Sequence, residues 1–224
     1  MERKVIITGD GSTTIHLPEW NEQYHSKHGA IQEAYHVFIK HGLRYFAQDH
    51  QQEELTSINI LEIGFGTGLN ALITLLESEK LNLKIDYVGV EAYPVEIDEI
   101  KTLNYADNLK MEASILNNLH TSAWEQKIFI TNNFSLTKQK KHFETIDDQD
   151  LYHIIYFDAF GARVQPELWT ESIFKKMYDA LKVNGVLVTY AAKGSVRRAM
   201  QAVGFKVEKL PGPPGKREML RAIK

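Results

Sequence analysis

The stretch Leu61-Glu-Ile-Gly-Phe-Gly-Thr-Gly-Leu-Asn70 predicts a buried β-strand that turns through glycines into a helix. The mostly apolar run 58–63 is typical of a parallel strand covered on both faces. From Leu69 to Leu76, apolar residues recur at helical spacing. The three glycines of the stretch have no Cβ, so the backbone turns tightly and its N–H groups are open to a ligand. The loop therefore predicts a nucleotide-type pocket.

An acidic residue, Glu91, ends the next predicted strand, which covers residues 86–91. It lies about where a doubly wound fold places the carboxylate that accepts hydrogen bonds from a ribose. A solvated charge at the strand end is the alternative. The glycines lack the Lys and Ser or Thr of a P-loop, which argues against a triphosphate site. The spacing Gly-x-Gly-x-Gly after Glu62 resembles the AdoMet-binding motif of class I methyltransferases more than the dinucleotide motif.

Composition bounds the class of protein. A chain of 224 residues with 43% hydrophobic residues predicts one substantial domain, 56–224, preceded by a small extension, 1–55. No run approaches 18 uncharged apolar residues and no signal-peptide core follows the N-terminus, so we expect a cytoplasmic protein without a membrane partner. The absence of cysteine excludes disulfides and thiolate chemistry, and the nine histidines lack metal-binding spacing, so we expect no metal.

The charge is uneven along the chain. Residues 193–224 hold nine Lys or Arg against two Glu, although the whole chain has a formal net charge of −3. Such a block often marks a polyanionic partner, and ordinary surface charge is the alternative.

The order of predicted elements indicates the fold. An N-terminal hairpin, 5–17, and a helix, 31–46, interrupted near Gly42, should pack over the sheet edge or form a lid on the cofactor cleft. The remaining expected segments are helices near 97–103 and 115–119, a third strand at 128–130 with a short one at 134–137, a basic loop at 138–141, strands at 152–157 and 186–190, and helices at 173–181 and 196–203.

The last two predicted strands, 205–210 and 218–223, are joined by a Pro-Gly loop with no room for a crossover helix, so they must be antiparallel. An alternating β/α chain that ends in this way has the topology of class I AdoMet-dependent methyltransferases. We therefore expect an α/β, Rossmann-like fold with a seven-stranded, mostly parallel sheet and an antiparallel last strand. The loop 211–217 and residues Arg197 and Arg198 should lie on the ligand rim, outside the carboxyl ends of the strands.

Five separated stretches resemble one family in order along nearly the whole chain. They are residues 24–39, 62–70, 157–160 with 166–169, 194–198 and 216–220. They are similar to the methyltransferase domain of the MnmC family. The resemblance implies AdoMet-dependent methylation of 5-aminomethyl(-2-thio)uridine at the tRNA wobble position. The fused members also have an FAD-dependent oxidase domain, for which 224 residues leave no room, so we expect a stand-alone enzyme whose substrate comes from other tRNA-modifying enzymes.

The resemblance also implies roles for single residues. Asp158 would be the catalytic residue that orients the amine and helps its proton leave, and the alternative is that it anchors a loop or the cofactor's ammonium group. Phe160 and Tyr190 would stack on the base, and Trp169 is expected in the core. Residues implied in cofactor binding are Glu62, Gly64, Phe65, Gly66, Thr67, Gly68, Asn70, Glu91 and Asp158. Residues implied in phosphate contacts are Arg197, Arg198, Lys216 and Arg217.

The sequence departs from the family after the catalytic position. The family's Asp-Gly-Phe-Ala-Pro reads Asp158-Ala-Phe-Gly-Ala162 here, so the loop should be shaped differently. No acid for the adenine amino group is evident among Asn132, Asn133, His142 and Glu144. The alternative functions are a small-molecule amine N-methyltransferase, an aminopropyltransferase-like enzyme, whose typical Gly-Gly-Gly-Asp-Gly loop is absent, and a non-catalytic RNA-binding module.

Overall fold

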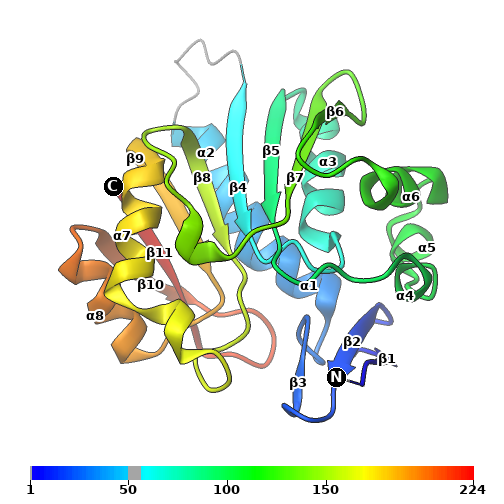
Figure 1. Cartoon of the computed structure of the whole chain (residues 1–224), viewed down its shortest axis with the longest axis horizontal. Coiled ribbons are helices and arrows are strands. Elements are labelled where there is room, and N and C mark those ends of the chain that lie inside the picture. Colours follow the sequence, from blue (N-terminus) through cyan, green and yellow to red (C-terminus); the bar gives the residue numbers. More distant parts are fainter. Residues whose placement is uncertain (1, 50–56) are drawn as a thin grey trace.

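One eight-stranded sheet forms the centre of the protein (Figure 1). The computed structural model describes residues 2–49 and 57–224, so the expected domain boundary at 55/56 lies outside the described residues. The strand order is β10-β11-β9-β8-β4-β5-β7-β6. The bounds are β4 (Ile58–Ile63), β5 (Ile85–Val90), β6 (Lys127–Phe129), β7 (Phe134–Gln139), β8 (Tyr152–Phe157), β9 (Leu181–Thr189), β10 (Lys206–Pro211) and β11 (Glu218–Ile223).

The pairing of the strands is that of a class I AdoMet-dependent methyltransferase, as predicted. Strand β4 is parallel to β5 and β8, β5 is parallel to β7, and β8 is parallel to β9. Strand β11 lies between β9 and β10 and is antiparallel to both. The predicted number of strands was wrong by one, because β6 adds an antiparallel edge strand beside β7. The parallel neighbour of β5 is thus β7, whereas the predicted third strand at 128–130 is the short edge strand, where Phe129 is 71% exposed.

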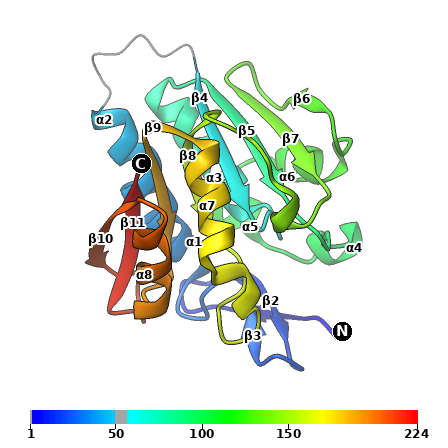
Figure 2. The ribbon, with the colours of Figure 1, turned by 60° about the vertical axis from the view of Figure 1, so that its left-hand side comes forward.

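Helices cover both faces of the sheet (Figure 2). One apolar core joins the sheet to the first helices and α3, and a second core joins the other face to α7 and α8. Helices α4, α5 and α6 pack together, with α6 against α3. The bounds are α1 (Ala30–Ala34), η1 (Tyr35–Leu43), α2 (Arg44–Asp49), α3 (Leu69–Leu81), α4 (Ile97–Ile100), α5 (Tyr105–Leu109), α6 (Ala113–Thr121), η2 (Phe143–Thr145), η3 (Pro166–Trp169), α7 (Glu171–Ala180) and α8 (Gly194–Ala202). No helix in the described ranges is long and apolar enough to cross a membrane.

The first helix does not break at Gly42, contrary to the prediction. Helices α1, η1 and α2 follow one another directly, and η1 is a π-helix. A Cβ on Gly42 would lie 3.1 Å from the Tyr156 ring and 3.1 Å from a methyl group of Val188. Glycine at this position therefore allows the helix to pack closely on β8 and β9, and the chain does not turn there.

Gly42→Ala is expected to lower the free energy of unfolding by about 1 kcal/mol, measured by urea titration. Alanine favours a helix over glycine by about 1 kcal/mol, but overpacking a rigid core costs about 1–3 kcal/mol. Tyr156 and Val188 are both fully buried in the core. Gly194→Ala is the matched control, because the nearest atom to its Cβ is the end of the flexible Arg198 side chain. Equal stability of both variants would contradict this account of Gly42.

The predicted basic loop at 138–141 begins inside a strand instead. Lys138 belongs to β7 and is 1% exposed. Its Nζ donates a hydrogen bond to the backbone oxygen of His120 and lies 4.9 Å from the Trp124 ring centroid. Burial lowers the pKa of Lys138 to about 8. This lysine holds α6 against the sheet and is not available to a polyanion.

A small second sheet lies beyond the carboxyl ends of β4 and β5 (Figure 1). It contains the predicted hairpin, β1 (Lys4–Ile7) and β2 (Thr13–Leu17), and a third strand, β3 (Glu22–Gln23). The N-terminal extension therefore covers the end of the main sheet at which α/β proteins bind ligands.

Candidate active site

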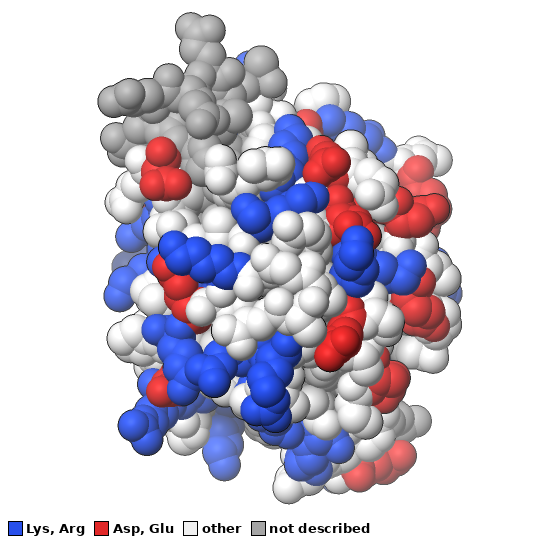
Figure 3. All heavy atoms as spheres, turned by 90° about the vertical axis from the view of Figure 1, so that its left-hand side faces the viewer, with Lys and Arg blue, Asp and Glu red and all other residues white. Residues whose placement is uncertain are grey.

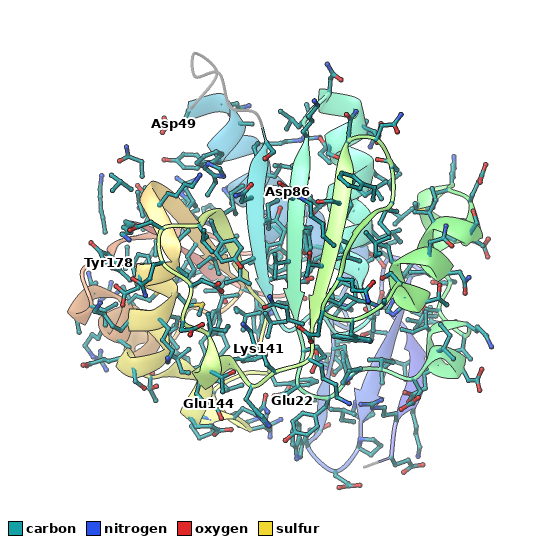
Figure 4. The ribbon with its side chains drawn as sticks, turned by 45° about the horizontal axis from the view of Figure 1, so that its top comes forward. Glu22, Asp49, Asp86, Lys141, Glu144 and Tyr178 are labelled. Atoms are coloured by element: carbon teal, nitrogen blue, oxygen red, sulfur yellow. The ribbon has the colours of Figure 1, made fainter. Side chains whose placement is uncertain are left out.

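A cavity of about 930 Å³ lies at the carboxyl ends of the parallel strands. Its wall combines the loops after β4, β5, β8 and β9 with the N-terminal extension and the segment 142–144. Figure 4 shows Glu22 and Glu144, which both line it, at this end of the sheet, whereas Asp86 of β5 lies away from it. The volume is in the range of pockets that enclose a nucleotide-sized ligand.

The glycine loop after β4 forms part of the wall through Gly64 and Gly66. Both have left-handed backbone angles, with φ of 90° and 49°. A Cβ on Gly64 would lie 2.8 Å from the backbone oxygen of Asp158, and one on Gly66 would lie 3.0 Å from the Tyr24 ring. Glycine at these positions therefore keeps the loop against its neighbours and its backbone accessible.

Three other residues of the glycine stretch lie behind the wall. Phe65 is 3% exposed and packs against Gly89, where a Cβ would collide with its ring. Thr67 is fully buried, and its hydroxyl bonds with His25 Nε2 at 2.7 Å. Gly68, with φ 71°, precedes α3. These residues shape the loop and do not line the cavity.

Glu91 joins the glycine loop to the end of β5. Its carboxylate accepts hydrogen bonds from the backbone N–H of Gly66 at 3.0 Å and of Tyr93 at 2.9 Å. Each carboxylate oxygen has a second lone pair, so hydroxyl groups in the cavity can donate to it as well. Glu91 lines the cavity directly after β5.

Asp158 lies on the cavity wall directly after β8. Asn70 donates to Asp158 Oδ2 at 2.8 Å and to Glu62 Oε1 at 2.9 Å, so one amide connects both carboxyl groups. Glu62 is fully buried, and neither it nor Asn70 lines the cavity. Burial raises the pKa of Asp158 and of Glu62 well above the usual carboxyl range, and the charge of Glu33 adds to the shift at Asp158.

Two aromatic side chains fix the loop that carries Asp158. The Tyr190 hydroxyl donates to the backbone oxygen of Ala159, and Trp169 Nε1 donates to that of Phe160, each at 2.8 Å. Trp169 is 5% exposed, which confirms its expected place in the core. Phe160 and Tyr190 line the cavity, and the ring of Phe160 packs edge-on against Tyr24, with centroids 5.0 Å apart.

The C-terminal basic residues divide into two groups. Lys216 lines the cavity, with its Nζ 2.6 Å from Glu33 Oε1 and 3.8 Å from the Tyr190 ring centroid. Arg197, Arg198 and Arg217 do not line it, and the last two are exposed. Figure 3 shows Lys and Arg side chains gathered on the lower part of the face that carries α7, α8 and β10.

Some residues of the wall were not identified from the sequence. Tyr24, His25 and Glu33 come from the N-terminal extension, and Tyr93 follows β5. Tyr24, His25 and Glu33 could have been found from the sequence, because they belong to the stretch 24–39 that resembles the family. The exposed ring of Tyr93 lies edge-on to His142, with centroids 5.7 Å apart. His142 and Glu144 line the cavity, whereas Asn132 and Asn133 do not.

Comparisons with known proteins show which sequences and folds this chain is similar to. A family described as S-adenosyl-L-methionine-dependent methyltransferase matches residues 131–224. The tRNA 5-methylaminomethyl-2-thiouridine biosynthesis bifunctional protein MnmC of Paraburkholderia xenovorans is 27% identical, over 96% of this chain and 34% of its own length. The crystal structure of MnmC2 from Aquifex aeolicus has a TM-score of 0.79 at 24% identity, over 99% of this chain and 69% of that one. The chain is thus similar in sequence to the MnmC proteins over most of its length and shares the fold of MnmC2.

Other relatives show the same pattern. The MnmC of Actinobacillus pleuropneumoniae is 29% identical, over 90% of this chain and 32% of its own length. The chain thus spans about a third of the length of the curated MnmC proteins it matches. Spermidine synthase from Thermotoga maritima shares the fold with a TM-score of 0.54 at 14% identity, over 99% of this chain and 72% of that one.

Proposed function

We propose that this protein transfers a methyl group from AdoMet to the amine of a 5-aminomethyl(-2-thio)uridine at the tRNA wobble position. One observation carries the proposal: one cavity is lined by Asp158, by a glycine loop with its acidic partner Glu91, and by two aromatic residues, Phe160 and Tyr190. The glycine loop with Glu91 suits a nucleoside cofactor, and the aromatic residues suit a base to be methylated.

The residues on the cofactor side fit AdoMet. Glycine at positions 64 and 66 lets the loop pack against Asp158 and Tyr24, where a Cβ would collide, and Glu91 offers carboxylate lone pairs for a ribose. The rings of Tyr93 and His142 lie at the same end of the cavity and suit contact with an adenine. Bound there, AdoMet would supply a methyl group activated by its positively charged sulfur.

Asp158 would prepare the amine for the reaction. A primary alkylamine is mostly protonated near neutral pH, and only its neutral form has the lone pair needed for attack. A carboxylate with a raised pKa accepts this proton more readily than an ordinary aspartate, which suits the role of general base. Asn70 holds one oxygen of the carboxyl group and so fixes its direction.

A flipped wobble base would reach this cavity from the side of Phe160 and Tyr190. Aromatic side chains that stack on unpaired bases are the usual means of binding single-stranded RNA. The exposed Arg198 and Arg217 would contact phosphates of the anticodon arm, which makes binding dependent on salt.

A direct test is methyl transfer from radiolabelled AdoMet to tRNA isolated from cells that lack the final methylation. Label recovered in the wobble uridine supports the proposal. Label found only in small amines would favour a small-molecule N-methyltransferase. Retention of RNA with no transfer to either would favour a non-catalytic RNA-binding module. Transfer of an aminopropyl group from decarboxylated AdoMet would favour the function of the spermidine synthases, with which the chain shares the fold.

Reversing two exposed charges should weaken tRNA binding. The double variant Arg198→Glu and Arg217→Glu is expected to lower tRNA affinity by at least about tenfold at low salt, because each replaces a phosphate contact by repulsion. Filter binding across a salt series measures the effect and its slope. Lys110→Glu, an exposed charge change away from the cavity, is the control. If the double variant binds tRNA as the control does, this basic face does not contact RNA.

A further inference from the structure

The Lys216 side chain lies in a complete binding arrangement for an alkylammonium group. Its Nζ is 2.6 Å from a carboxylate oxygen of Glu33 and 3.8 Å from the centroid of the Tyr190 ring. A carboxylate beside an aromatic face is the combination by which proteins recognise ammonium ligands. All three residues line the cavity that also contains Asp158.

We propose that Glu33 and the face of Tyr190 form a subsite for a primary alkylammonium, which Lys216 occupies in this structure and the substrate's aminomethyl group takes over. This inference rests on the proposed function. Lysine ends in the same chemical group as a protonated aminomethyl substituent, a primary ammonium on a methylene carbon. One cation would thus replace another of the same kind, without a change of charge in the subsite.

The surroundings of Glu33 explain why the subsite holds a cation. Glu33 is 7% exposed, and its second oxygen accepts the backbone N–H of Ser26 at 2.8 Å. A buried carboxylate without a counter-ion is strongly unfavourable. The ammonium of Lys216 therefore compensates Glu33 until another cation arrives.

The Lys216 side chain can leave the subsite toward the protein surface. It belongs to the loop between β10 and β11, and the side chain is 33% exposed. The backbone of this loop is closed by hydrogen bonds from Lys216 N–H to Pro213 and from Gly212 N–H to Arg217, so the side chain alone has to swing. Arg217, its neighbour, is exposed on the outer surface. A displaced Lys216 would reach the same phosphates as Arg217.

The subsite and Asp158 line the same cavity. Glu33 raises the pKa of Asp158 and Lys216 lowers it, so both charges act on that carboxyl group. An ammonium held between Glu33 and Tyr190 would lie in the cavity that also holds the proposed base, Asp158. Glu33 would then be a specificity-determining residue for amines.

The test is binding of the nucleoside 5-aminomethyluridine to the full chain by calorimetry, with uridine as the probe that lacks the ammonium. Lys216→Met empties the subsite and keeps the length of the side chain. We expect it to bind 5-aminomethyluridine at least about tenfold more tightly than the wild type, since the ligand no longer competes with a lysine for a buried carboxylate. Adding Glu33→Gln should abolish this gain. Uridine affinity should not change in any variant.

Lys193→Met, at an exposed lysine outside the cavity, is the matched control. No gain in Lys216→Met, an equal gain for uridine, or a gain that survives Glu33→Gln would each overturn the subsite. Thermal unfolding of each variant verifies that it is folded. The binding measurement does not depend on methyl transfer. If the wild type methylates tRNA but Lys216→Met gains no affinity for 5-aminomethyluridine, only the subsite is rejected. Absence of tRNA methylation would instead reject the proposed function.

Discussion

Replacement of Asp158 by asparagine is expected to slow methyl transfer to tRNA by about 10²–10⁴-fold, the usual contribution of a positioned general base. Asparagine has the same shape, and its amide oxygen can still accept the hydrogen bond from Asn70. It cannot accept a proton. Single-turnover rates with saturating AdoMet measure the chemical step, and calorimetry with S-adenosylhomocysteine should show little change in cofactor affinity.

Asp107→Asn is the control for this variant, because Asp107 is exposed on α5 and outside the cavity. If Asp158→Asn keeps the wild-type rate, Asp158 is not the general base. If it loses cofactor affinity to the same degree as rate, Asp158 binds AdoMet and the catalytic role is unsupported.

The pH profile gives the same hypothesis an independent test. Asp158 must be ionised to accept a proton, and burial raises its pKa well above the ordinary carboxyl range. The rate should therefore rise with pH through that raised pKa, and the acidic limb should lie at higher pH than for an exposed aspartate. The limb should be lost in Asp158→Asn. A wild-type rate that does not vary between pH 5 and 9 would contradict this role.

Glu91→Ala is expected to lower AdoMet affinity by about 10- to 100-fold, which corresponds to the roughly 1.5–3 kcal/mol of a hydrogen bond to a charged group. The variant loses the carboxylate proposed to accept the ribose hydroxyls. It also leaves the N–H groups of Gly66 and Tyr93 without their acceptor, which loosens the glycine loop. Calorimetry with S-adenosylhomocysteine measures the loss.

Glu91→Gln separates these two contributions, since glutamine keeps one acceptor oxygen but no charge. We expect an affinity between those of the wild type and Glu91→Ala. Glu112→Ala, a change at an exposed glutamate outside the cavity, serves as the control. Wild-type affinity in Glu91→Ala would show that the cofactor is held elsewhere.

Several features of the fold follow from short-range patterns. The apolar strand 58–63, the glycine turn and the helix after it occur where predicted, because strand and helix periodicity and the needs of a tight turn are local properties. The Pro-Gly connection was too short for a helix and so required the antiparallel pair β10 and β11. The prediction of a helix break at Gly42 was wrong. Glycine is needed there because the helix packs closely on β8 and β9, which lie over 100 residues away in the chain.

The sequence by itself determined the order of strands and helices, the place of the glycine loop and the acidic residues that follow two strands, since each depends on neighbours a few positions apart. Only the tertiary structure decided which of these residues face the cavity. It put Glu62, Asn70 and Thr67 behind the wall and brought Glu33 from the first helix to Lys216 near the C-terminus. The physical reason is that elements distant in the chain must pack together to form the cavity wall. A local sequence pattern does not encode which side chains then face the cavity.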